Sequence, residues 1–464
     1  MNVEPGETGV NPYIFRAYDI RGVVGSDLTP GIAELIGRAF GTFVRESKGG
    51  HVVVGRDNRI SSPDLSNGLI KGLIDCGIRV TDIGLATSPL LYFAAIQWKV
   101  DGGISVTASH LPPEYNGFKL VGQGGVALSP ADIAHLKDTI NSRRYDSGHG
   151  SHEMGDPVSE YKDRFDALPK VLRPIHAVVD TGNGVAGLFA PSLLRSSGCR
   201  VTELHCDLDG TFPNHIPNPE LEQNVKDLEQ KVVEVQADIG LALDGDGDRL
   251  GIVNEKGEKY QADMATILLA RDFLTRHPGA RIIVDIKSSS NLITDIKKRG
   301  GEPVLWKSGH SLIERKMIEE GILLAGELSG HMFTAEGYYP IDDALYAACR
   351  IVHIISRTPL RLSEHFADLP RLYSTPVLEF HCPDSQKFGI VKQLTSRFQE
   401  DHEVITIDGA RIDFGDGWGL IRASNTNPAL SVRCEASTPR RLEEIRLTIV
   451  DALREYPSVD LSGQ

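Results

Sequence analysis

The sequence lacks long apolar runs and any sign of a secretion signal. No apolar run in its 464 residues approaches the ~20 residues that a membrane-spanning helix needs. Residues 1–11 are polar and show no basic stretch followed by an apolar one, so no signal peptide is predicted. We therefore expect a cytoplasmic protein that does not bind membranes.

Basic residues are also scarce, because 49 lysines and arginines face 63 aspartates and glutamates, a formal net charge of −14. This balance argues against general affinity for nucleic acids or membranes, which need a basic face. An anionic small molecule would need a locally basic site. Closely spaced cysteine pairs are missing too, which favours reduced thiols over a disulfide framework or a zinc site. The six scattered cysteines are Cys76, Cys199, Cys206, Cys349, Cys382 and Cys434.

A strand, a tight turn and a helix-like stretch recur along the chain. The first example is Val52-Val-Val-Gly-Arg-Asp-Asn-Arg59 with a helical stretch over 63–75. Similar openings follow at Ala177–Gly184 and at Ile282–Ser290. This order is typical of parallel α/β units, and three copies indicate a repeated domain.

Each unit has a later strand that runs into an unusual polar loop. Thr107–Pro113 follows the first such strand, Asp244–Asp248 the second and Gly326–His331 the third. Because ligands collect at the carboxyl ends of strands in open α/β sheets, the three loops could face one shared cleft. Polar loops after apolar strands occur in every α/β protein, but the contents of these loops favour the functional interpretation.

The pattern changes after about Leu369. Short strands and a helix over 387–400 alternate without another strand-turn-helix opening, which indicates a smaller α+β domain. The predicted domains are 1–155 with the serine loop, 156–256 with the acidic loop, 257–369 with the Gly326–His331 loop, and 370–464.

The acidic loop, Leu241-Ala-Leu-Asp-Gly-Asp-Gly-Asp-Arg-Leu250, places Asp244, Asp246 and Asp248 at alternate positions. Such close carboxylates raise each other's pKa unless a cation neutralises them, and oxygen ligands favour Mg²⁺, Ca²⁺ or Mn²⁺. A plain acidic turn is the alternative. A calcium-binding EF-hand fits less well, because Arg249 stands where that loop needs glycine and the flanks are strand-like.

Ser109 lies in Thr107-Ala-Ser-His-Leu-Pro-Pro113, directly after a predicted strand. The G-x-S-x-G motif of hydrolases is absent, so acyl transfer has no support. The serine could simply cap a turn. With His110 beside it, Lys119 downstream and a metal loop elsewhere, it also suits phosphoryl transfer, which needs a nucleophile and cations around phosphate.

Two further polar segments could bind a sugar phosphate. Glu327 and Ser329, in the loop that ends at His331, could hold sugar hydroxyls, and His310 in Lys307-Ser-Gly-His310 could carry a proton. The stretch Arg422-Ala-Ser-Asn-Thr-Asn-Pro428 could clamp phosphate. A surface turn explains Ser-Asn-Thr-Asn-Pro alone equally well, but Arg422 and Arg433 on adjoining strands favour anion binding.

Taken together, these motifs resemble the α-D-phosphohexomutases, within them the phosphomannomutase/phosphoglucomutase group. The resemblance runs from Phe15-Arg-Ala-Tyr-Asp-Ile-Arg-Gly22 to Arg433-Cys-Glu435 and includes Asp209-Gly-Thr-Phe-Pro-Asn-His-Ile-Pro-Asn-Pro219, whose physical role the sequence alone does not explain. The resemblance implies an α/β fold, with three similar α/β/α domains of mixed sheet and a C-terminal α+β domain around a central cleft.

The resemblance also implies a chemistry and roles for individual residues. Phosphate would move reversibly between O1 and O6 of mannose or glucose phosphate through phosphoserine and a hexose 1,6-bisphosphate, with Mg²⁺ bound, in a monomer or weak homodimer. Ser109 would carry phosphate and join Asp244, Asp246 and Asp248 around the metal. The implied catalytic and binding residues are Lys119, His310, Arg21, Arg249, Tyr18, Lys287, Glu327, Ser329, Arg422, Ser424, Asn425, Thr426 and Arg433.

Two positions bear on how far the resemblance extends. Leu111 replaces the asparagine usual in the family, which removes a side-chain hydrogen bond near Ser109 and affects the expected rate. Leu328 stands where phosphoglucosamine mutases usually carry glutamine. Phosphoglucosamine mutase activity is therefore the second candidate, after phosphomannomutase/phosphoglucomutase activity. A non-catalytic protein that binds metal or sugar phosphate is the other alternative.

Overall fold

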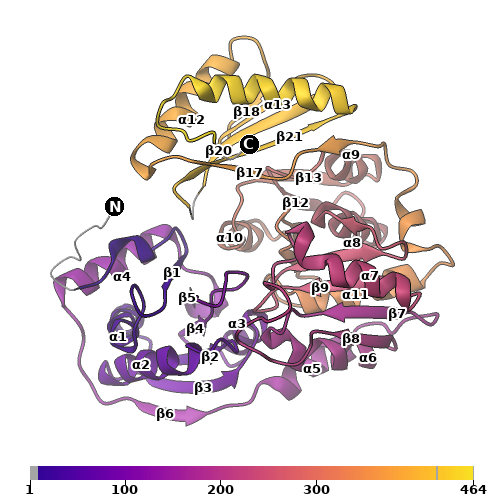
Figure 1. Ribbon diagram of the computed structural model, residues 1–464. Helices are drawn as coiled ribbons and strands as arrows, with labels where there is room; N and C mark the ends of the chain where they lie inside the picture. The colour runs from indigo at the N-terminus through magenta and orange to yellow at the C-terminus, as the bar shows by residue number, and fades with distance from the viewer. Residues whose placement is uncertain (1–8, 425–426, 463–464) are drawn as a thin grey trace. The chain divides into compact units, whose positions relative to one another are not determined.

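The computed structural model describes residues 9–424 and 427–462, which form two compact units (Figure 1). The first unit comprises Met1–His277 and His310–Ala367, and the second comprises Pro278–Gly309 and Asp368–Gln464. The second unit is thus assembled from two separate stretches of the chain.

The first sheet has six strands in the order β1-β5-β4-β2-β3-β6 and is mixed, since β1 and β4 run antiparallel to β5 while β2 runs parallel to β3 and β4. Val52 and Val54 belong to the core formed with α1 and α2. Val53 points to the other face, where α3 packs on β2, because successive strand residues alternate. The elements are η1 (Pro12–Ile14), β1 (Asp19–Val23), α1 (Pro30–Glu46), β2 (His51–Arg56), α2 (Ser62–Asp75), β3 (Arg79–Leu85), α3 (Ser88–Gln97), β4 (Gly102–Val106), β5 (Tyr115–Val121), η2 (Gln123–Gly125), α4 (Pro130–Ser142) and β6 (Ser151–Met154).

The second sheet has five strands in the order β11-β10-β9-β7-β8, with β7 parallel to β8 and β9 and with β10 antiparallel to its neighbours. One face carries Val178 and Ala242 against Leu228 and Val232 of α7. The elements are α5 (Val158–Asp166), β7 (His176–Asp180), η3 (Val185–Leu188), α6 (Ala190–Ser196), β8 (Arg200–Leu204), η4 (Glu222–Val225), α7 (Lys226–Glu234), β9 (Ile239–Leu243), β10 (Leu250–Asn254) and β11 (Lys259–Tyr260).

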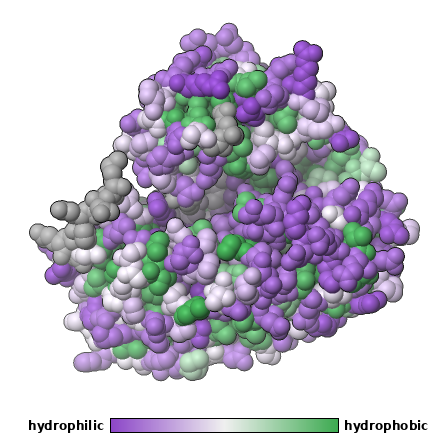
Figure 2. Space-filling view, viewed as in Figure 1, coloured by the Kyte–Doolittle hydropathy of each residue, from purple (hydrophilic) through white to green (hydrophobic). Residues whose placement is uncertain are grey.

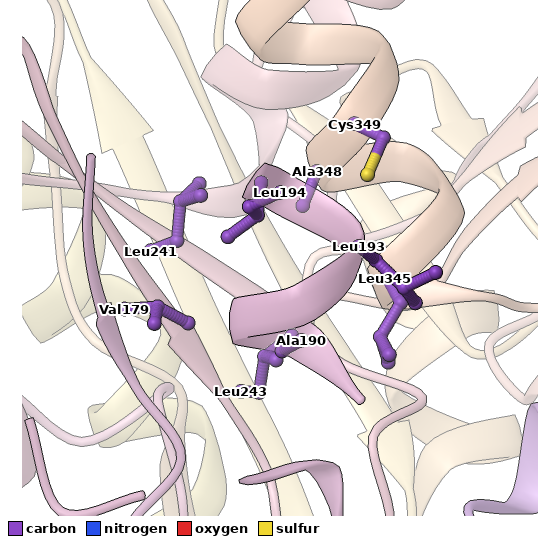
Figure 3. Close-up of a pocket in the computed structure, with 9 residues that line it drawn as sticks. All are labelled: Val179, Ala190, Leu193, Leu194, Leu241, Leu243, Leu345, Ala348 and Cys349. Atoms are coloured by element: carbon purple, nitrogen blue, oxygen red, sulfur yellow. The ribbon is translucent and has the colours of Figure 1, made fainter. Parts of the chain in front are cut away.

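The other face of this sheet packs against α6 and α11, and Figure 3 shows the apolar side chains that converge there. Leu241 and Leu243 of β9 point into this layer, immediately before the acidic loop begins. The layer anchors the strand that presents the three aspartates. Its lining residues are Val179, Ala190, Leu193, Leu194, Leu241, Leu243, Leu345, Ala348 and Cys349.

The remainder of the first unit is helical, with a short antiparallel pair, β14 and β15. Helix α11 packs against α6, α8 and β10, so it binds the second sheet to the part of the chain that carries the Gly326–His331 loop. The elements are α8 (Ala262–Arg276), α10 (His310–Glu320), β14 (Leu324–Gly326), β15 (Met332–Thr334), α11 (Ala344–Ser356) and η5 (Leu362–Phe366).

The second unit combines a parallel strand pair, β12 and β13, with an antiparallel sheet in the order β16-β21-β20-β19-β18, in which β17 also pairs with β21. Helices α12 and α13 pack on this sheet and close a core of their own. The elements are β12 (Arg281–Asp285), α9 (Ser290–Lys298), β13 (Glu302–Trp306), β16 (Tyr373–Ser374), β17 (Leu378–His381), α12 (Asp384–Phe398), β18 (Val404–Ile405), β19 (Ala410–Asp413), β20 (Gly417–Ala423), β21 (Ala429–Ala436) and α13 (Pro439–Arg454).

The repeated strands predicted from the sequence are present, but one local detail differs. After β7 the chain enters a 3₁₀ turn, η3, before the short helix α6, whereas β2 leads into α2 without an intervening 3₁₀ helix. In the C-terminal part of the chain, an Asp408-Gly409 turn separates β18 from β19, and Gly409 has φ +89° there.

Polar residues dominate the face shown in Figure 2, and apolar residues are scattered among them. No helix in the described ranges combines the length and apolar character needed to span a bilayer. All six cysteines are free thiols. Burial raises the pKa of Cys199, Cys349 and Cys434 to about 12, which makes these thiols unreactive.

Candidate active site

The acidic loop is the turn of the β9–β10 hairpin, and it buries all three aspartates completely. Asp244, Asp246 and Asp248 each offer an oxygen, and these oxygens lie within 4.8 Å of one another. Gly247 adopts φ +77°, a left-handed conformation that glycine tolerates, and this lets the chain turn between the second and third aspartate. The sequence pattern therefore folds into a compact carboxylate cluster.

Lys119 on β5 provides the nearest positive charge. Its ammonium lies 2.6 Å from Asp246 Oδ2 and also contacts Asp248 Oδ2. Burial alone would lower the pKa of Lys119, but the charges of Asp246 and Asp248 outweigh it and raise that pKa well above its usual value. Lys119 is therefore protonated in this state.

The pKa values of Asp244 and Asp248 are shifted in opposite directions. Burial, together with the charges of Asp248 and Asp246, raises the pKa of Asp244 well above its ordinary value. Burial acts in the same direction on Asp248, but Lys119, His331 and Arg249 outweigh it and lower the pKa of Asp248. Asp244 therefore retains a proton more readily than Asp248 does, unless a further cation enters the cluster.

Two carboxylate oxygens fit the requirement for such a cation. Asp246 Oδ1 and Asp248 Oδ1 are buried, yet neither accepts a hydrogen bond from any part of the chain that the structure describes. Buried charged oxygens without hydrogen bonds are costly, and a bound metal ion removes that cost. The cluster therefore has the chemistry of a site for a hard divalent cation.

Ser109 meets the acidic loop across 135 positions of sequence, as the motifs suggested. Its Oγ donates to Asp244 Oδ2 at 2.7 Å, and its side chain is buried. Ser109 has φ +53°, which is unfavourable for a residue with a Cβ and is typical of strained functional positions. Gly245 permits the approach, because a Cβ there would lie 2.4 Å from the Ser109 carbonyl oxygen.

A buried arginine that the sequence analysis did not identify holds this strained loop. The guanidinium of Arg59 donates to the carbonyls of Ser109 at 2.9 Å, Leu111 at 2.6 Å, Pro112 at 2.6 Å and Tyr115 at 3.1 Å. Its Nε donates to Asp57, the counter-charge. The planar, five-donor guanidinium thus fixes several carbonyls at once, which a lysine cannot do.

Ser88, at the start of α3, was also not predicted. Its amide donates to the Asp246 carbonyl at 2.9 Å, and its hydroxyl donates to Asp246 Oδ2 at 2.6 Å. Ser88 therefore fixes both the main chain and the carboxylate of the middle aspartate. The only sequence signal was a serine that follows a strand and precedes Pro89, which is also an ordinary helix start.

Three further residues singled out in the sequence, His110, Arg21 and Tyr18, have defined contacts in this part of the structure. His110 Nδ1 lies 3.0 Å from Ser109 Oγ, and burial with the charges of Arg249 and Arg21 lowers the pKa of His110 well below its usual value. Arg21 pairs with Asp19 at 2.7 Å. Tyr18 lies edge-on to His310, with ring centroids 5.2 Å apart.

His310 lies among basic and imidazole groups of the same site. Its ring centroid is 5.4 Å from that of His331. Burial, with the nearby His331 and Lys119, lowers the pKa of His310 well below its usual value. The imidazole is therefore neutral at neutral pH and can accept a proton, as a general base must.

The loop at 326–331 joins the acidic loop through main-chain contacts. The Leu250 amide donates to the Gly330 carbonyl at 3.0 Å, and Arg249 forms an isolated bridge with His331. Glu327 and Ser329 are buried beside it, and the Ser329 hydroxyl makes no hydrogen bond with the described residues. The two loops are thus in direct main-chain contact.

His331 received no role from the sequence but lies between Arg249 and Asp342. Its Nε2 accepts from Arg249 Nε at 3.1 Å, so the proton of the neutral ring lies on Nδ1, which is 2.7 Å from Asp342 Oδ2. Burial, opposed in part by Asp248, lowers the pKa of His331 to about 4. Arg249 is held on its other side by Glu220 at 3.6 Å.

The second unit carries the remaining predicted residues, and Lys287 is one of them. Its ammonium lies 3.3 Å from Asp285 Oδ2. Its carbonyl accepts from Arg433, which is 1% exposed, and the flanking carbonyls of Ile286 and Ser288 accept from Arg411 at 2.5 and 2.9 Å. The structure therefore places Arg433 behind the Lys287 segment as a support.

Arg422 and Ser424 lie at the end of β20, in the same unit. Arg422 pairs with Asp408 at 3.0 Å, and the Ser424 hydroxyl accepts from the Asn427 amide at 3.1 Å. Lys387 of α12, another residue not predicted, donates to the carbonyls of Ser424 at 2.6 Å and Asn427 at 2.9 Å. The other two predicted members of this loop, Asn425 and Thr426, lie outside the described residues.

Four family descriptions match the chain in order. They are phosphoglucomutase/phosphomannomutase alpha/beta/alpha domain I at residues 12–146, domain II at 159–257, domain III at 261–373, and the C-terminal domain at 378–452. The first three share one fold type, in agreement with the predicted repetition of α/β/α domains before a different C-terminal one. The family boundaries place the third domain across both compact units.

Similar proteins extend over nearly the whole chain. A phosphomannomutase/phosphoglucomutase of Pseudomonas aeruginosa strain PAO1 is 45% identical over 96% of this chain and 96% of its own. A phosphoglucomutase of Neisseria gonorrhoeae is 42% identical over 93% and 95%. A solved family structure from Burkholderia thailandensis has a TM-score of 0.91 at 41% identity, covering 97% and 99%. The chain therefore belongs to the phosphoglucomutase/phosphomannomutase family.

Proposed function

We propose that this protein interconverts the 1-phosphate and 6-phosphate of mannose, glucose or both. The observation that carries the proposal is the 2.7 Å hydrogen bond from the Ser109 hydroxyl to Asp244, inside a buried carboxylate cluster. A serine held at a site for a hard cation, with Lys119 and Arg249 nearby, suits reversible phosphoryl transfer. Family membership and the names of the relatives support the same reaction.

In this reaction Ser109 carries the phosphate. The bond from phosphorus to Ser109 Oγ breaks, and a bond forms from phosphorus to the free hydroxyl oxygen of the hexose phosphate, giving a 1,6-bisphosphate. The other phosphate of that intermediate then returns to Ser109 in the reverse sense. Mg²⁺ held by Asp244, Asp246 and Asp248 would neutralise the charge of the transferring group.

Two side chains have the protonation states that the proton transfers need. His310, neutral at neutral pH, accepts the proton of the attacking sugar hydroxyl. Lys119, protonated, supplies a proton to Ser109 Oγ as that oxygen leaves. The next half-reaction reverses both transfers, so the enzyme returns to its starting state.

The remaining residues bind and orient the substrate. Arg21, Arg249 and Tyr18 hold the transferring phosphate, and Glu327 and Ser329 hold sugar hydroxyls. This role fits the Ser329 hydroxyl, which makes no hydrogen bond with the residues that the structure describes. Lys287 belongs with the residues around the transferring phosphate, and the phosphate that does not react is bound by Arg422, Ser424, Asn425 and Thr426. Arg433, 1% exposed, supports this part of the site from behind the Lys287 segment. We expect the enzyme to work in the cytoplasm as a monomer or weak homodimer on small hexose phosphates, without nucleic acid partners.

A coupled assay tests the proposal. Mannose 1-phosphate, glucose 1-phosphate and glucosamine 1-phosphate are each supplied with Mg²⁺ and a hexose 1,6-bisphosphate primer, with and without a chelator. We expect turnover of mannose or glucose phosphate that the chelator abolishes. A preference for glucosamine phosphate would favour the second candidate, and no turnover of any sugar phosphate would indicate a binding protein.

A further inference from the structure

A second group of potential metal ligands lies in the part of the chain that forms the second sheet. Asp180, His205 and His215 each offer a ligand atom, and these atoms lie within 4.8 Å of one another. Asp180 ends β7, His205 follows β8, and His215 belongs to the Asp209–Pro219 stretch to which the proposed reaction gives no role. The group shares no residue with the Asp244 cluster.

Both ring nitrogens of His215 face hydrogen-bond acceptors, so a neutral ring cannot satisfy both contacts. Its Nδ1 lies 3.0 Å from the Ile216 carbonyl, which can only accept, so this nitrogen carries a proton. Its Nε2 lies 3.0 Å from Asp180 Oδ2, a second acceptor. A neutral ring would therefore point a lone pair at a carboxylate, and either a second proton or a metal ion must lie between them.

The arrangement around His215 matches that of metal-bound histidines. A ligating histidine usually donates its other ring N–H to a carbonyl or carboxylate, which fixes the tautomer and the ring orientation. For His215 the acceptor of this hydrogen bond is the Ile216 carbonyl. For His205 it is Asp227 Oδ2, which lies 3.0 Å from His205 Nε2. The two rings meet edge to face, with centroids 5.5 Å apart.

The backbone is shaped to bring these side chains together. His205 has φ +48°, a conformation that costs free energy for a residue other than glycine. The main chain there is fixed because the His205 carbonyl accepts from the Asn183 amide at 2.7 Å and the Thr181 hydroxyl at 3.0 Å. Asp180 is 1% exposed, whereas the side chains of His205 and His215 are 17% and 13% exposed, so an ion can enter from solvent.

We propose that Asp180, His205 and His215 form a second metal site for a divalent transition ion such as Zn²⁺, with Asp227 orienting His205. Two imidazoles and one carboxylate select this class of ion, whereas the three carboxylates of the acidic loop select a hard ion such as Mg²⁺. The site is structural, because it contains no nucleophile and lies outside the reacting residues.

The site also supports the acidic loop. The Val185 amide donates to the Gly245 carbonyl at 3.2 Å, and a Cβ on Gly245 would lie 3.2 Å from Pro217, two residues after His215. The ion would therefore join the segment that begins at Asp180 to the segment that contains His215, and Gly245 contacts both of them through Val185 and Pro217. This gives the Asp209–Pro219 stretch a physical role, namely to support the loop that carries Asp244 and Asp246.

The test uses the full-length protein after chelator treatment, in millimolar Mg²⁺ to fill the acidic loop. Zn²⁺ is titrated by calorimetry, and Co²⁺ by visible absorption. We expect one ion per chain beyond Mg²⁺ and a higher Tm with Zn²⁺. His205→Gln, at the more exposed ligand, should weaken Zn²⁺ binding at least ~10-fold and remove the Tm shift, and Asp227→Asn should weaken binding ~10-fold.

Two controls make the outcome decisive. His135→Gln removes an exposed histidine that pairs with Glu46 at 2.8 Å and should leave Zn²⁺ binding unchanged. His331→Asn removes a histidine of the proposed active site and should also leave the extra ion in place. Binding lost in His331→Asn but kept in His205→Gln would overturn the proposal. So would the absence of any ion beyond Mg²⁺, which would leave the group as hydrogen-bonded ion pairs only.

Discussion

Two loops that carry proposed phosphate-binding residues are both held by a buried cation, but in different ways. In the loop of Ser109, Arg59 donates to four carbonyls, including that of Ser109 itself. In the loop that follows Arg422, Lys387 donates to two carbonyls, at Ser424 and Asn427. The first loop is fixed along its length, and the second is fixed at its two ends.

This difference fits the two roles that we propose. A nucleophile must be aligned with the reacting phosphorus atom, and small displacements are costly in rate. A phosphate-binding loop that serves both the 1-phosphate and the 6-phosphate sugar needs charge and donors but tolerates adjustment. The planar guanidinium suits the first task, and the single ammonium of a lysine suits the second.

The sharpest test of the comparison is Ser109→Ala. We expect mutase turnover to fall to the background of the assay, because Ser109 is the hydroxyl of this loop that donates to the carboxylate cluster and is proposed to carry the phosphate. Folding should be retained, since the hydroxyl is replaced by a smaller group and Arg59 binds only the main chain of Ser109. Thermal unfolding checks the fold, and near-normal activity would refute the phosphoserine assignment.

The next largest effect is expected from Arg59→Lys. The ammonium cannot span four carbonyls, so the serine loop should shift and kcat should fall about 10²-fold with little change in KM. Steady-state kinetics with the preferred sugar phosphate measures the split. Arg79→Lys, at an exposed arginine paired with Glu153, is the matched control. Equal losses in both variants, or a change confined to KM, would contradict the positioning role.

Arg422→Ala tests the second loop by removing its main positive side chain. Charge-assisted hydrogen bonds contribute about 1.5–3 kcal/mol, which corresponds to a rise in KM of about 10- to 100-fold, with kcat changed less. The loss of Arg422 also removes the cation that pairs with Asp408, and the Asp408 carboxylate would then repel phosphate. Asp408→Asn therefore serves as a counterpart that should lower KM. An unchanged KM in Arg422→Ala would exclude the clamp.

Lys387→Met should have a smaller effect that separates the two modes of support. Without the ammonium, the two ends of the loop lose their anchor but keep Arg422 and the Ser424–Asn427 hydrogen bond, so KM should rise about 3- to 10-fold. Because Lys387 is buried, Tm should also fall, and Lys392→Met on the exposed side of α12 is the control. A loss of kcat as large as that of Arg59→Lys would erase the proposed difference between the loops.

The sequence predicted the elements and the contact between Ser109 and the acidic loop, but not the cations that hold the loops. Strand-turn-helix openings and Asp-Gly repeats are local patterns, and local patterns can be recognised in one segment. Arg59 donates to main-chain carbonyls at least 50 positions away in the sequence. Every residue has such a carbonyl, so the residue types of the partners do not reveal these hydrogen bonds. Lys387, which also donates to carbonyls, was missed for the same reason, and Ser88 was missed because its partner, Asp246, lies 158 positions away in the sequence. Arg433 could be placed on a strand from the sequence, but not behind Lys287.

The smallest expected effect concerns Leu111, which is next but one to Ser109. Arg59 holds the Leu111 carbonyl at 2.6 Å, so the backbone of the loop is already fixed and only the side chain differs from the asparagine usual in the family. Leu111→Asn should therefore add one neutral hydrogen bond near the phosphoserine, which contributes about 0.5–1 kcal/mol and would raise kcat about two- to fivefold at constant KM. Leu111→Ala, which shortens the side chain without adding a donor, should not raise kcat. If both substitutions raise it equally, removal of the leucine and not the amide is responsible, and if neither does, Arg59 alone determines the position of the serine loop.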